Sequence, residues 1–195
     1  MDIVLGVAAL IALFPVFLIT AVCIKREDGG AVMFTQTRIG MYGRRFKMYK
    51  FRSMRMDAEK IHEKLREQYG CEDVSFKLKD DPRVTKVGKV IRALNIDELP
   101  QIINIVKGDM SLVGPRPLPD YEFIEEQKRF KGKYDERYMV PGGLTCIWQI
   151  SDRSEPDFAD RMQMDVDYSR TYGLLMDVRL CLQTAIYSIT GKAAY

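Results

Sequence analysis

Residues 95–117 read NIDELPQIINIVKGDMSLVGPRP, and this stretch joins two neighbouring carboxylates, an apolar-periodic segment and a loop of glycine, proline and arginine. Four apolar side chains follow the i, i+3, i+4, i+7 spacing of one buried helix face: Leu99, Ile102, Ile103 and Val106. We therefore expect a helix that Asp97 caps, with Pro100 in its first turn, where the missing N–H costs little. Such a helix start would point Asp97, Glu98 and free N–H groups toward one spot. The pair is then either an ordinary solvated helix start or a site where a cation, or nearby Arg and Lys, balances the charge.

The composition restricts the classes of function. A chain of 195 residues can bury one good core, and a formal charge of +3, mixed along the sequence, gives no broad nucleic-acid surface. The four cysteines have no CxxC pair, which is typical of reduced thiols and not of a disulfide frame or a zinc site: Cys23, Cys71, Cys146 and Cys181. The single histidine, His62, lies in a charged helical pattern, so serine–histidine and cysteine–histidine schemes have little support. A metal site would use oxygen ligands, which suit magnesium better than zinc.

Residues 3–24 form an apolar run without a charge. As a helix, the run would be about 33 Å long, enough to cross a hydrocarbon core of about 30 Å. Pro15 removes a helix hydrogen bond in the middle of the run, so it predicts either a kinked spanning helix or a helix–break–helix that returns to the same face. The residues alone favour the kinked span, since membrane helices tolerate proline. Lys25 and Arg26 place the C-terminal end of the run on the cytoplasmic side.

The rest of the chain alternates short strands and helices, so we expect an α+β fold. The expected segments are strands at 31–37 and 46–54, and helices at 56–69, 87–94, 120–137 (ending in a loop) and 160–168. The second strand would have one basic face, which includes Lys50. The apolar segment 172–189 contains charged residues that would each cost about 2.5–3.5 kcal/mol at mid-bilayer. We therefore expect it to lie in the membrane interface or to pack on the domain.

Three arginines lie where they could meet an anion. Arg92 comes five residues before Asp97, Arg116 sits between two prolines that restrict its loop, and Arg153 lies in the loop 151–154. The single tryptophan, Trp148, fits a core aromatic better than a ligand stack.

Taken in order, these motifs resemble the bacterial sugar transferase family, the monotopic phosphoglycosyl transferases. The resemblance covers nearly the whole chain and is most specific in IDELPQ (96–101) and KGDMSLVGPRP (107–117). It also includes FTQTRIG (34–40), FKMYKFRSM (46–54), DDPRVTKVGKVIR (80–92), PGGLTCIWQISDR (141–153), MDVDY (164–168) and the final GKAAY.

The resemblance implies a two-step transfer of a sugar 1-phosphate from a UDP-sugar to undecaprenyl phosphate, with release of UMP. It implies that Asp97 attacks the β-phosphate to form a phosphoaspartyl-sugar intermediate, and that Asp97 and Glu98 hold Mg²⁺. A carboxylate nucleophile is already ionised at neutral pH, which suits a chain with one histidine. The further active-site residues implied are Arg92, Arg116 and Arg153 as phosphate ligands, Asp165 as another acid, and Lys50 as an additional candidate.

The resemblance also implies that residues 1–24 form a re-entrant membrane helix broken at Pro15, with both ends cytosolic. Residues 25–195 would form a small, mainly helical catalytic domain with short strands and interfacial amphipathic helices, on the cytoplasmic face of the bacterial inner membrane. Phe14 departs from the serine that many members carry before this proline. The segment 56–76 is similar to that of the larger, hexose-phosphate-transferring members, and whether the chain is trimmed from a longer protein stays open.

Two other classes of function remain. A membrane-anchored module that binds nucleotide sugars or polyprenyl phosphate without turnover would explain the arginines, but not the Asp97–Glu98 pair. An ordinary inverting glycosyltransferase would release UDP instead of UMP. Glucose and galactose are the first candidates for the sugar, and the oligomeric state is open, a homodimer being one alternative.

Overall fold

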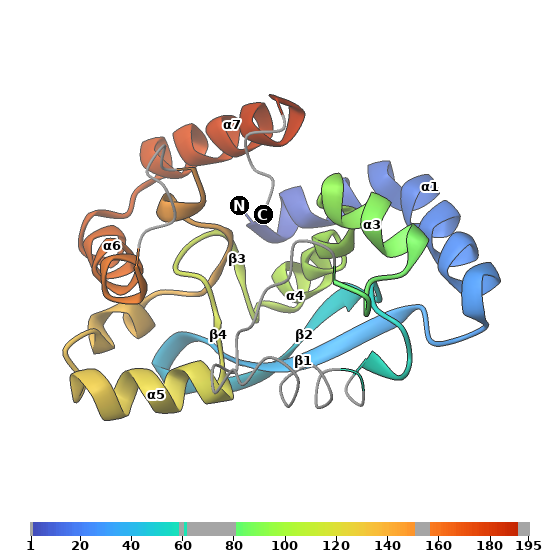
Figure 1. The fold of residues 1–195 in the computed structure, drawn as a ribbon. Helices are drawn as coiled ribbons and strands as arrows, with labels where there is room; N and C mark the ends of the chain where they lie inside the picture. The colour runs from blue at the N-terminus through green and yellow to red at the C-terminus, as the bar shows by residue number, and fades with distance from the viewer. Residues whose placement is uncertain (1, 59–60, 62–80, 151–156, 191–195) are drawn as a thin grey trace. The chain divides into compact units, whose positions relative to one another are not determined.

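The computed structural model describes residues 2–58, 61, 81–150 and 157–190 (Figure 1). Its elements, with 3-10 helices written η, are α1 (Asp2–Asp28), β1 (Met33–Ile39), η1 (Met41–Gly43), β2 (Arg45–Phe51), α3 (Lys86–Ala93), η2 (Ile96–Glu98), α4 (Gln101–Lys107), β3 (Ser111–Val113), β4 (Leu118–Pro119), α5 (Asp120–Phe130), η3 (Asp135–Met139), β5 (Gly143–Thr145), η4 (Ile147–Ile150), α6 (Phe158–Thr171) and α7 (Leu174–Thr190). Helices dominate and the sheets are small, which confirms the α+β prediction. The helix predicted at 56–69 falls largely, and His62 and Cys71 wholly, outside the described residues.

Two small sheets hold the loop that carries Arg116. One has the strand order β2-β1-β4, with β1 antiparallel to β4 and Arg38 opposite Pro119. The other pairs β3 with β5 in parallel, with Ser111 opposite Gly143. The loop 114–117 leaves β3 and enters β4, so a strand of a different sheet fixes each of its ends.

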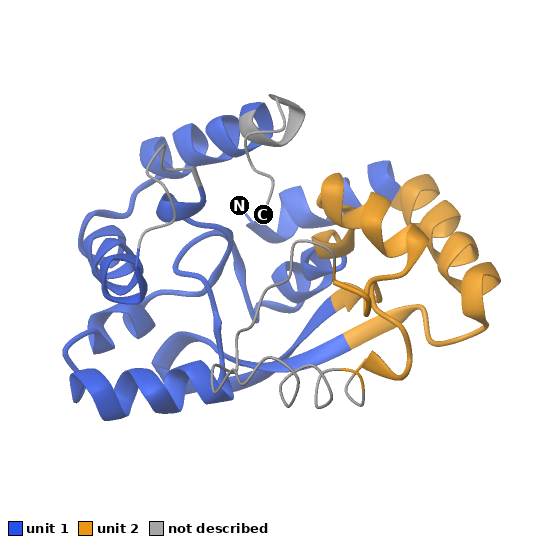
Figure 2. Cartoon of the chain, in the orientation of Figure 1, with its two compact units in different colours: residues 1–13, 35–49, 100–195 blue, residues 14–34, 50–99 orange. Residues whose placement is uncertain are grey.

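The chain divides into two compact units, coloured separately in Figure 2. Unit 1 comprises residues 1–13, 35–49 and 100–195, and unit 2 comprises residues 14–34 and 50–99. Unit 2 has one buried cluster around Ile24, Phe51 and Ile91, whereas three clusters form the core of unit 1. Because α1, β1 and β2 each contribute residues to both, the units interleave along the sequence.

The apolar run predicted at residues 3–24 is helical and belongs to α1. Within the described part of the chain, α1 is the one helix long and apolar enough to cross a membrane. Large apolar side chains are exposed along it, including Val4, Ile11 and Ile19. Helix α1 continues through Pro15, and the break that we expect at this proline stays a prediction.

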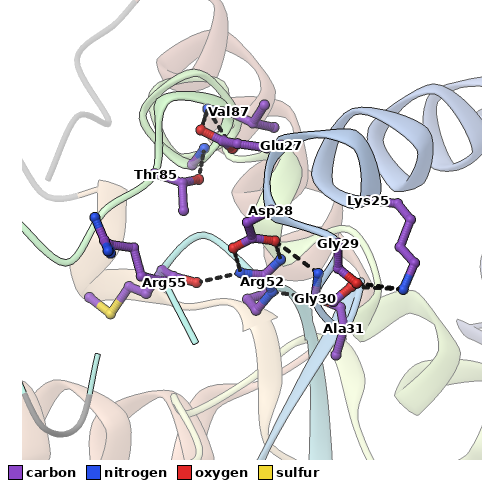
Figure 3. A network of polar contacts seen from close by, with 12 residues as sticks. Lys25, Glu27, Asp28, Gly29, Gly30, Ala31, Arg52, Arg55, Thr85 and Val87 are labelled. Atoms are coloured by element: carbon purple, nitrogen blue, oxygen red, sulfur yellow. Dashed lines mark hydrogen bonds and ion pairs between the residues drawn. The ribbon is translucent and has the colours of Figure 1, made fainter. Parts of the chain in front are cut away.

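A polar network in unit 2 holds the end of α1 (Figure 3). The guanidinium of Arg52 donates two hydrogen bonds to the Asp28 carboxylate, at 2.5 and 2.6 Å, and these bonds lower the pKa of Asp28 to about 2. Glu27 accepts from the backbone N–H groups of Lys86, at 2.7 Å, and Val87, at 3.2 Å. These are free N–H groups of the first turn of α3, so Glu27 acts as a cap from another helix.

Close backbone packing also determines where α3 lies. The Thr85 side chain accepts from the Gly88 N–H and caps the helix. A Cβ on Gly88 would lie 2.0 Å from the Ser53 carbonyl oxygen, so only glycine allows this approach. The last turn of α3 carries Arg92 and leads directly to η2.

Candidate active site

Asp97 and Glu98 lie in η2, a single tight turn between α3 and α4. Asn95 enters this turn in the left-handed conformation, with φ 53° and ψ 19°, which asparagine tolerates better than most residues. The turn is closed by the Glu98 N–H, which donates to Asn95 O at 3.3 Å, and by the Leu99 N–H, which donates to Ile96 O at 3.1 Å.

The predicted capping role of Asp97 is wrong. Helix α4 begins at Gln101, with Pro100 in the N-cap position. Pro100 has no N–H to donate to Ile96 O, so the α-helical bonding does not extend back through it, and Leu99 donates to that carbonyl instead. The carboxylate pair therefore belongs to the preceding 3-10 turn.

The predicted buried face of this helix is also partly wrong. Ile102 is buried, but the fully buried positions are Asn104 and Ile105, while Ile103 and Val106 are only half-buried. Asn104 is buried because its side chain bonds to the backbone of β2, accepting from the N–H of residue 49 at 3.0 Å and donating to the carbonyl of residue 47 at 2.8 Å. A polar residue that pairs with a strand backbone is invisible to an apolar pattern.

The surroundings of the carboxylate pair make it electrostatically unusual. Asp97 is half-buried, and burial, followed by the charge of Glu98, raises its pKa to about 6. Lys50 and Arg92 oppose this rise. Nζ of Lys50 lies 2.5 Å from Oε1 of Glu98, and both side chains are less than a fifth exposed. Unit 2 thus brings together four of the seven residues that the sequence picked out.

Arg116 and Asp165 lie in unit 1. The Arg116 guanidinium lies 5.8 Å from the ring centroid of Trp148, and that of Arg161 lies 5.5 Å from the same ring. Trp148, expected in the core, is half-buried and serves both cations as a π surface. Arg153 lies outside the described residues.

Asp165 is fully buried on α6, where it forms an ion pair with Arg137 at 2.6 Å. Burial raises the pKa of Asp165, and the charge of Arg137 opposes the rise. Sequence reasoning missed Arg137. In the sequence, Arg137 looks like its charged neighbours Asp135 and Glu136, which suggests an exposed segment. Its burial results from the packing of η3 on α6, which the local sequence does not show.

The carboxylates fit part of a magnesium shell. Among the described residues, no group of three or more His, Cys, Asp or Glu side chains is arranged to hold a metal ion. Magnesium usually takes one or two protein carboxylates and completes its shell with substrate phosphates and water. Asp97 and Glu98 can supply that share, and the repulsion between them, which helps to raise the pKa of Asp97, is what a cation would relieve.

Comparison with known proteins identifies the family. The model of the family described as "Bacterial sugar transferase" matches residues 1–191. The exopolysaccharide production protein ExoY of Sinorhizobium fredii is 38% identical over 202 residues, covering 100% of this chain and 86% of the relative. Two longer relatives are each 36% identical and are covered over 40% of their length, with 100% of this chain aligned. They are the undecaprenyl-phosphate galactose phosphotransferase of Salmonella typhimurium and the UDP-glucose:undecaprenyl-phosphate glucose-1-phosphate transferase of Escherichia coli.

The chain thus spans about two fifths of the length of these longer relatives and most of the shorter one. The family match includes the turn that carries Asp97 and Glu98 and the loop that carries Arg116. The chain belongs to the bacterial sugar transferase family.

Proposed function

We propose that this chain transfers a sugar 1-phosphate from a UDP-sugar to undecaprenyl phosphate and releases UMP. This reaction would begin the assembly of an exopolysaccharide, a capsule, an O-antigen or another glycoconjugate. The observation that carries the proposal is the half-buried Asp97, next to a Glu98 that is already held by a lysine, within a chain of this family. The names of two relatives, a galactose phosphotransferase and a glucose-1-phosphate transferase that act on undecaprenyl phosphate, support the substrate class.

Asp97 is the nucleophile in this proposal. One of its carboxylate oxygens forms a bond to the β-phosphorus of the UDP-sugar, and the bond from that phosphorus to the oxygen bridging to the α-phosphorus breaks, so UMP leaves. A phosphate oxygen of the lipid then attacks the same phosphorus, and the bond to Asp97 breaks. The carboxylate is regenerated and the product is an undecaprenyl diphosphate sugar. Neither step needs a histidine base.

The charged side chains around Asp97 have separate roles. Lys50 holds Glu98 in place and, with Arg92, favours the ionised form of Asp97 that attacks. Asp97 and Glu98 would hold Mg²⁺, which when bound offsets the negative charge of the diphosphate. Arg92, Arg116 and Arg153 would bind phosphate oxygens, for which the guanidinium fork is well suited.

We propose that α1 is re-entrant and that both of its ends lie on the cytoplasmic face. The Asp2 carboxylate accepts a hydrogen bond from the Ser111 hydroxyl at 2.5 Å, and Gly6 packs against Ile105 and Val106. These partners follow Lys25 in the chain, and among the described residues no helix after α1 is long and apolar enough to carry them across the bilayer. The contacts therefore support placing the start of α1 on the same side as Lys25.

The remaining part of the chain would form the membrane-associated catalytic domain, residues 25–195, at the inner membrane of a bacterium. Helix α7 supports this placement because it exposes large apolar side chains at spacings of one helix stripe, with Leu175 88%, Leu182 62% and Ile186 59% exposed. Such a stripe fits a helix that lies in the bilayer interface.

The experiment that tests the reaction identifies the released nucleotide. The full chain in detergent is mixed with Mg²⁺, undecaprenyl phosphate and a panel of UDP-sugars that starts with glucose and galactose. We expect UMP with at least one sugar, and none from an Asp97→Asn variant. Release of UDP would instead indicate an ordinary glycosyltransferase, and binding without any turnover would indicate a binding module.

A second measurement isolates the first step. Without lipid acceptor, labelled UMP should exchange into the UDP-sugar, because a covalent intermediate makes the first step reversible on its own. A direct transfer in one step would give no exchange until lipid is added, and that result would remove Asp97 as nucleophile.

A further inference from the structure

The loop 114–117 is held in large part through its carbonyl groups. Three consecutive carbonyls each accept a hydrogen bond from outside the loop: Pro115 from the Gly143 N–H at 2.9 Å, Arg116 from Arg137 Nη2 at 2.8 Å, and Pro117 from Arg38 Nη1 at 2.9 Å. Two of the four loop residues are prolines, which have no N–H to donate. The direction in which Arg116 leaves the loop thus depends on the groups that hold these carbonyls.

Among the side chains that hold the loop, Arg137 is itself fixed by burial and by further hydrogen bonds. It is 2% exposed, and Nη2, which holds the loop, also bonds to the Asp165 carboxylate at 2.6 Å. Nη1 donates to the Tyr138 hydroxyl at 3.0 Å. A buried guanidinium is tolerated only when it is paired, so Asp165 is what keeps Arg137 in this place.

Burial separates the residues that can meet a substrate from those that cannot. Asp165 is 0% exposed and bonded to Arg137, whereas Arg116 is half-buried and its guanidinium reaches the Trp148 ring. A phosphate can therefore meet Arg116, but not Asp165.

We propose that Arg137, held by Asp165, is a positioning residue that sets the direction of Arg116 toward the phosphates of the substrate. This proposal rests on the phosphate-binding role of Arg116 in the proposed function. Asp165, the further acid implied by the resemblance, then acts on the loop through Arg137 and the Arg116 backbone, without touching the substrate.

The chain contains a matched control for this clamp. Arg170 on α6 forms an ion pair with Glu136 on η3 at 2.6 Å, so it joins the same two elements as the Arg137–Asp165 pair. Both partners are more than half exposed. The Arg170–Glu136 pair thus connects α6 to η3, as the Arg137–Asp165 pair does, but Arg170 makes no bond to the Arg116 carbonyl.

The experiment compares Arg137→Lys with Arg170→Lys in the full chain in detergent. Lysine keeps the charge at Asp165, but its single ammonium cannot reproduce the planar fork that reaches Asp165, the Arg116 carbonyl and Tyr138 together. We expect kcat/KM for the UDP-sugar to fall about tenfold or more in Arg137→Lys, because small displacements of a positioning group have large kinetic effects. Arg170→Lys should stay within about twofold of the wild type.

A double-mutant cycle shows whether the effect passes through Arg116. In an Arg116→Ala background, adding Arg137→Lys should change kcat/KM by less than about twofold. Full activity of Arg137→Lys, or an equal loss in both backgrounds, would overturn the proposal. If thermal melts show that Arg137→Lys does not fold, Tyr138→Phe replaces it in the same cycle. A loss that disappears without Arg116 supports the clamp, and any other result overturns it.

Hydrogen exchange gives a readout that needs no turnover. Within the loop only Gly114 and Arg116 have an N–H, and the Gly114 N–H, which donates to Thr145 O at 3.0 Å, is the internal reference. Exchange at Arg116 should be faster in Arg137→Lys than in Arg170→Lys, and equal rates would overturn the clamp. If the wild type released no UMP with any sugar, the proposed function would fail, and this comparison would still decide whether Arg137 holds the loop.

Discussion

At the scale of single residues, Asp97 is held where its surroundings oppose its charge. Burial and the neighbouring Glu98 raise its pKa from 3.8 to about 6, and Lys50 and Arg92 compensate only in part. Between these two values the folded chain keeps a proton that the unfolded chain releases. The resulting stability is complete below about pH 4 and is lost as the pH rises through about 6.

We therefore expect Asp97→Asn to stabilise the protein while it abolishes the reaction. In EDTA at pH 7.5, the free energy of unfolding should rise on the order of 1–3 kcal/mol, because a shift of one pKa unit is worth about 1.4 kcal/mol. Activity measured with Mg²⁺ should fall by roughly 10³-fold or more, as expected when a nucleophile is removed. Thermal melts and UMP release measure the two effects.

The same variant at pH 4.5 is the control for that prediction. Asp97 is then largely protonated in the folded wild type but still mostly ionised in the unfolded chain, so the stability gap between the two proteins should shrink to about a third of its size at pH 7.5. A gap of the same size at both pH values, or a less stable variant at pH 7.5, would contradict an unfavourably placed charge.

Some residue roles could be read from the sequence and others could not. Asp97, Glu98 and Arg92 stand close together in the chain, so spacing alone indicated that Arg92 could reach an anion held at the carboxylate pair. Lys50 lies 48 positions from Glu98, and its candidacy rested on a basic strand and a family resemblance. No feature of the sequence pointed to Arg137, since a charged residue in a charged segment is expected to be exposed to solvent. Its burial is seen only in the folded structure.

At the scale of elements, the prediction succeeded where nearby residues determine the ends of a helix. The helix expected at 87–94 is α3, Lys86–Ala93, because Thr85 supplies its cap within the same stretch. It failed at the start of α4, where Pro100 and the left-handed Asn95 create a separate turn. The strand expected at 46–54 ends at Phe51, and Met54 forms only an isolated bridge with Val84.

The position of α3 depends on one glycine, which leads to a second prediction. Gly88→Ala would place a methyl group 2.0 Å from the Ser53 carbonyl oxygen, and this backbone cannot move aside cheaply. We expect a loss of about 2–4 kcal/mol in stability, as for an overpacked core. UMP release should fall as well, since α3 leads into the turn that carries Asp97.

Gly173→Ala is the matched control for Gly88→Ala. Gly173 has no heavy atom within 4 Å of the added Cβ and connects α6 to α7, so its stability should change by less than about 0.5 kcal/mol. Equal thermal melts for the two alanine variants would show that the approach of α3 to Ser53 is not tight.

At the scale of the whole molecule, the N-terminal helix makes polar contacts at both of its ends. Asp2 bonds to Ser111, which lies 109 positions later in the chain, whereas Asp28 at the other end bonds to Arg52. The two contacts belong to different compact units, and both partners follow the helix in the chain.

We expect a tag on the N-terminus of the full chain to be reached only from the cytoplasm. In intact spheroplasts, added protease should leave both an N-terminal and a C-terminal tag uncut, and both should be cut once the membrane is opened. Removal of the N-terminal tag alone from intact spheroplasts would identify α1 as a spanning helix.

The sequence by itself determined the family, the α+β class, the apolar helix and the carboxylate pair. Each of these depends on residues that are neighbours in the chain or on motifs in a particular order, and both kinds of information are present before folding. Only the tertiary structure decided that Asp97 begins no helix, that Lys50 holds Glu98 and that Asp165 is occupied by Arg137. Burial and pairing between distant residues arise when elements pack, because packing removes water and brings together charges that local spacing cannot relate.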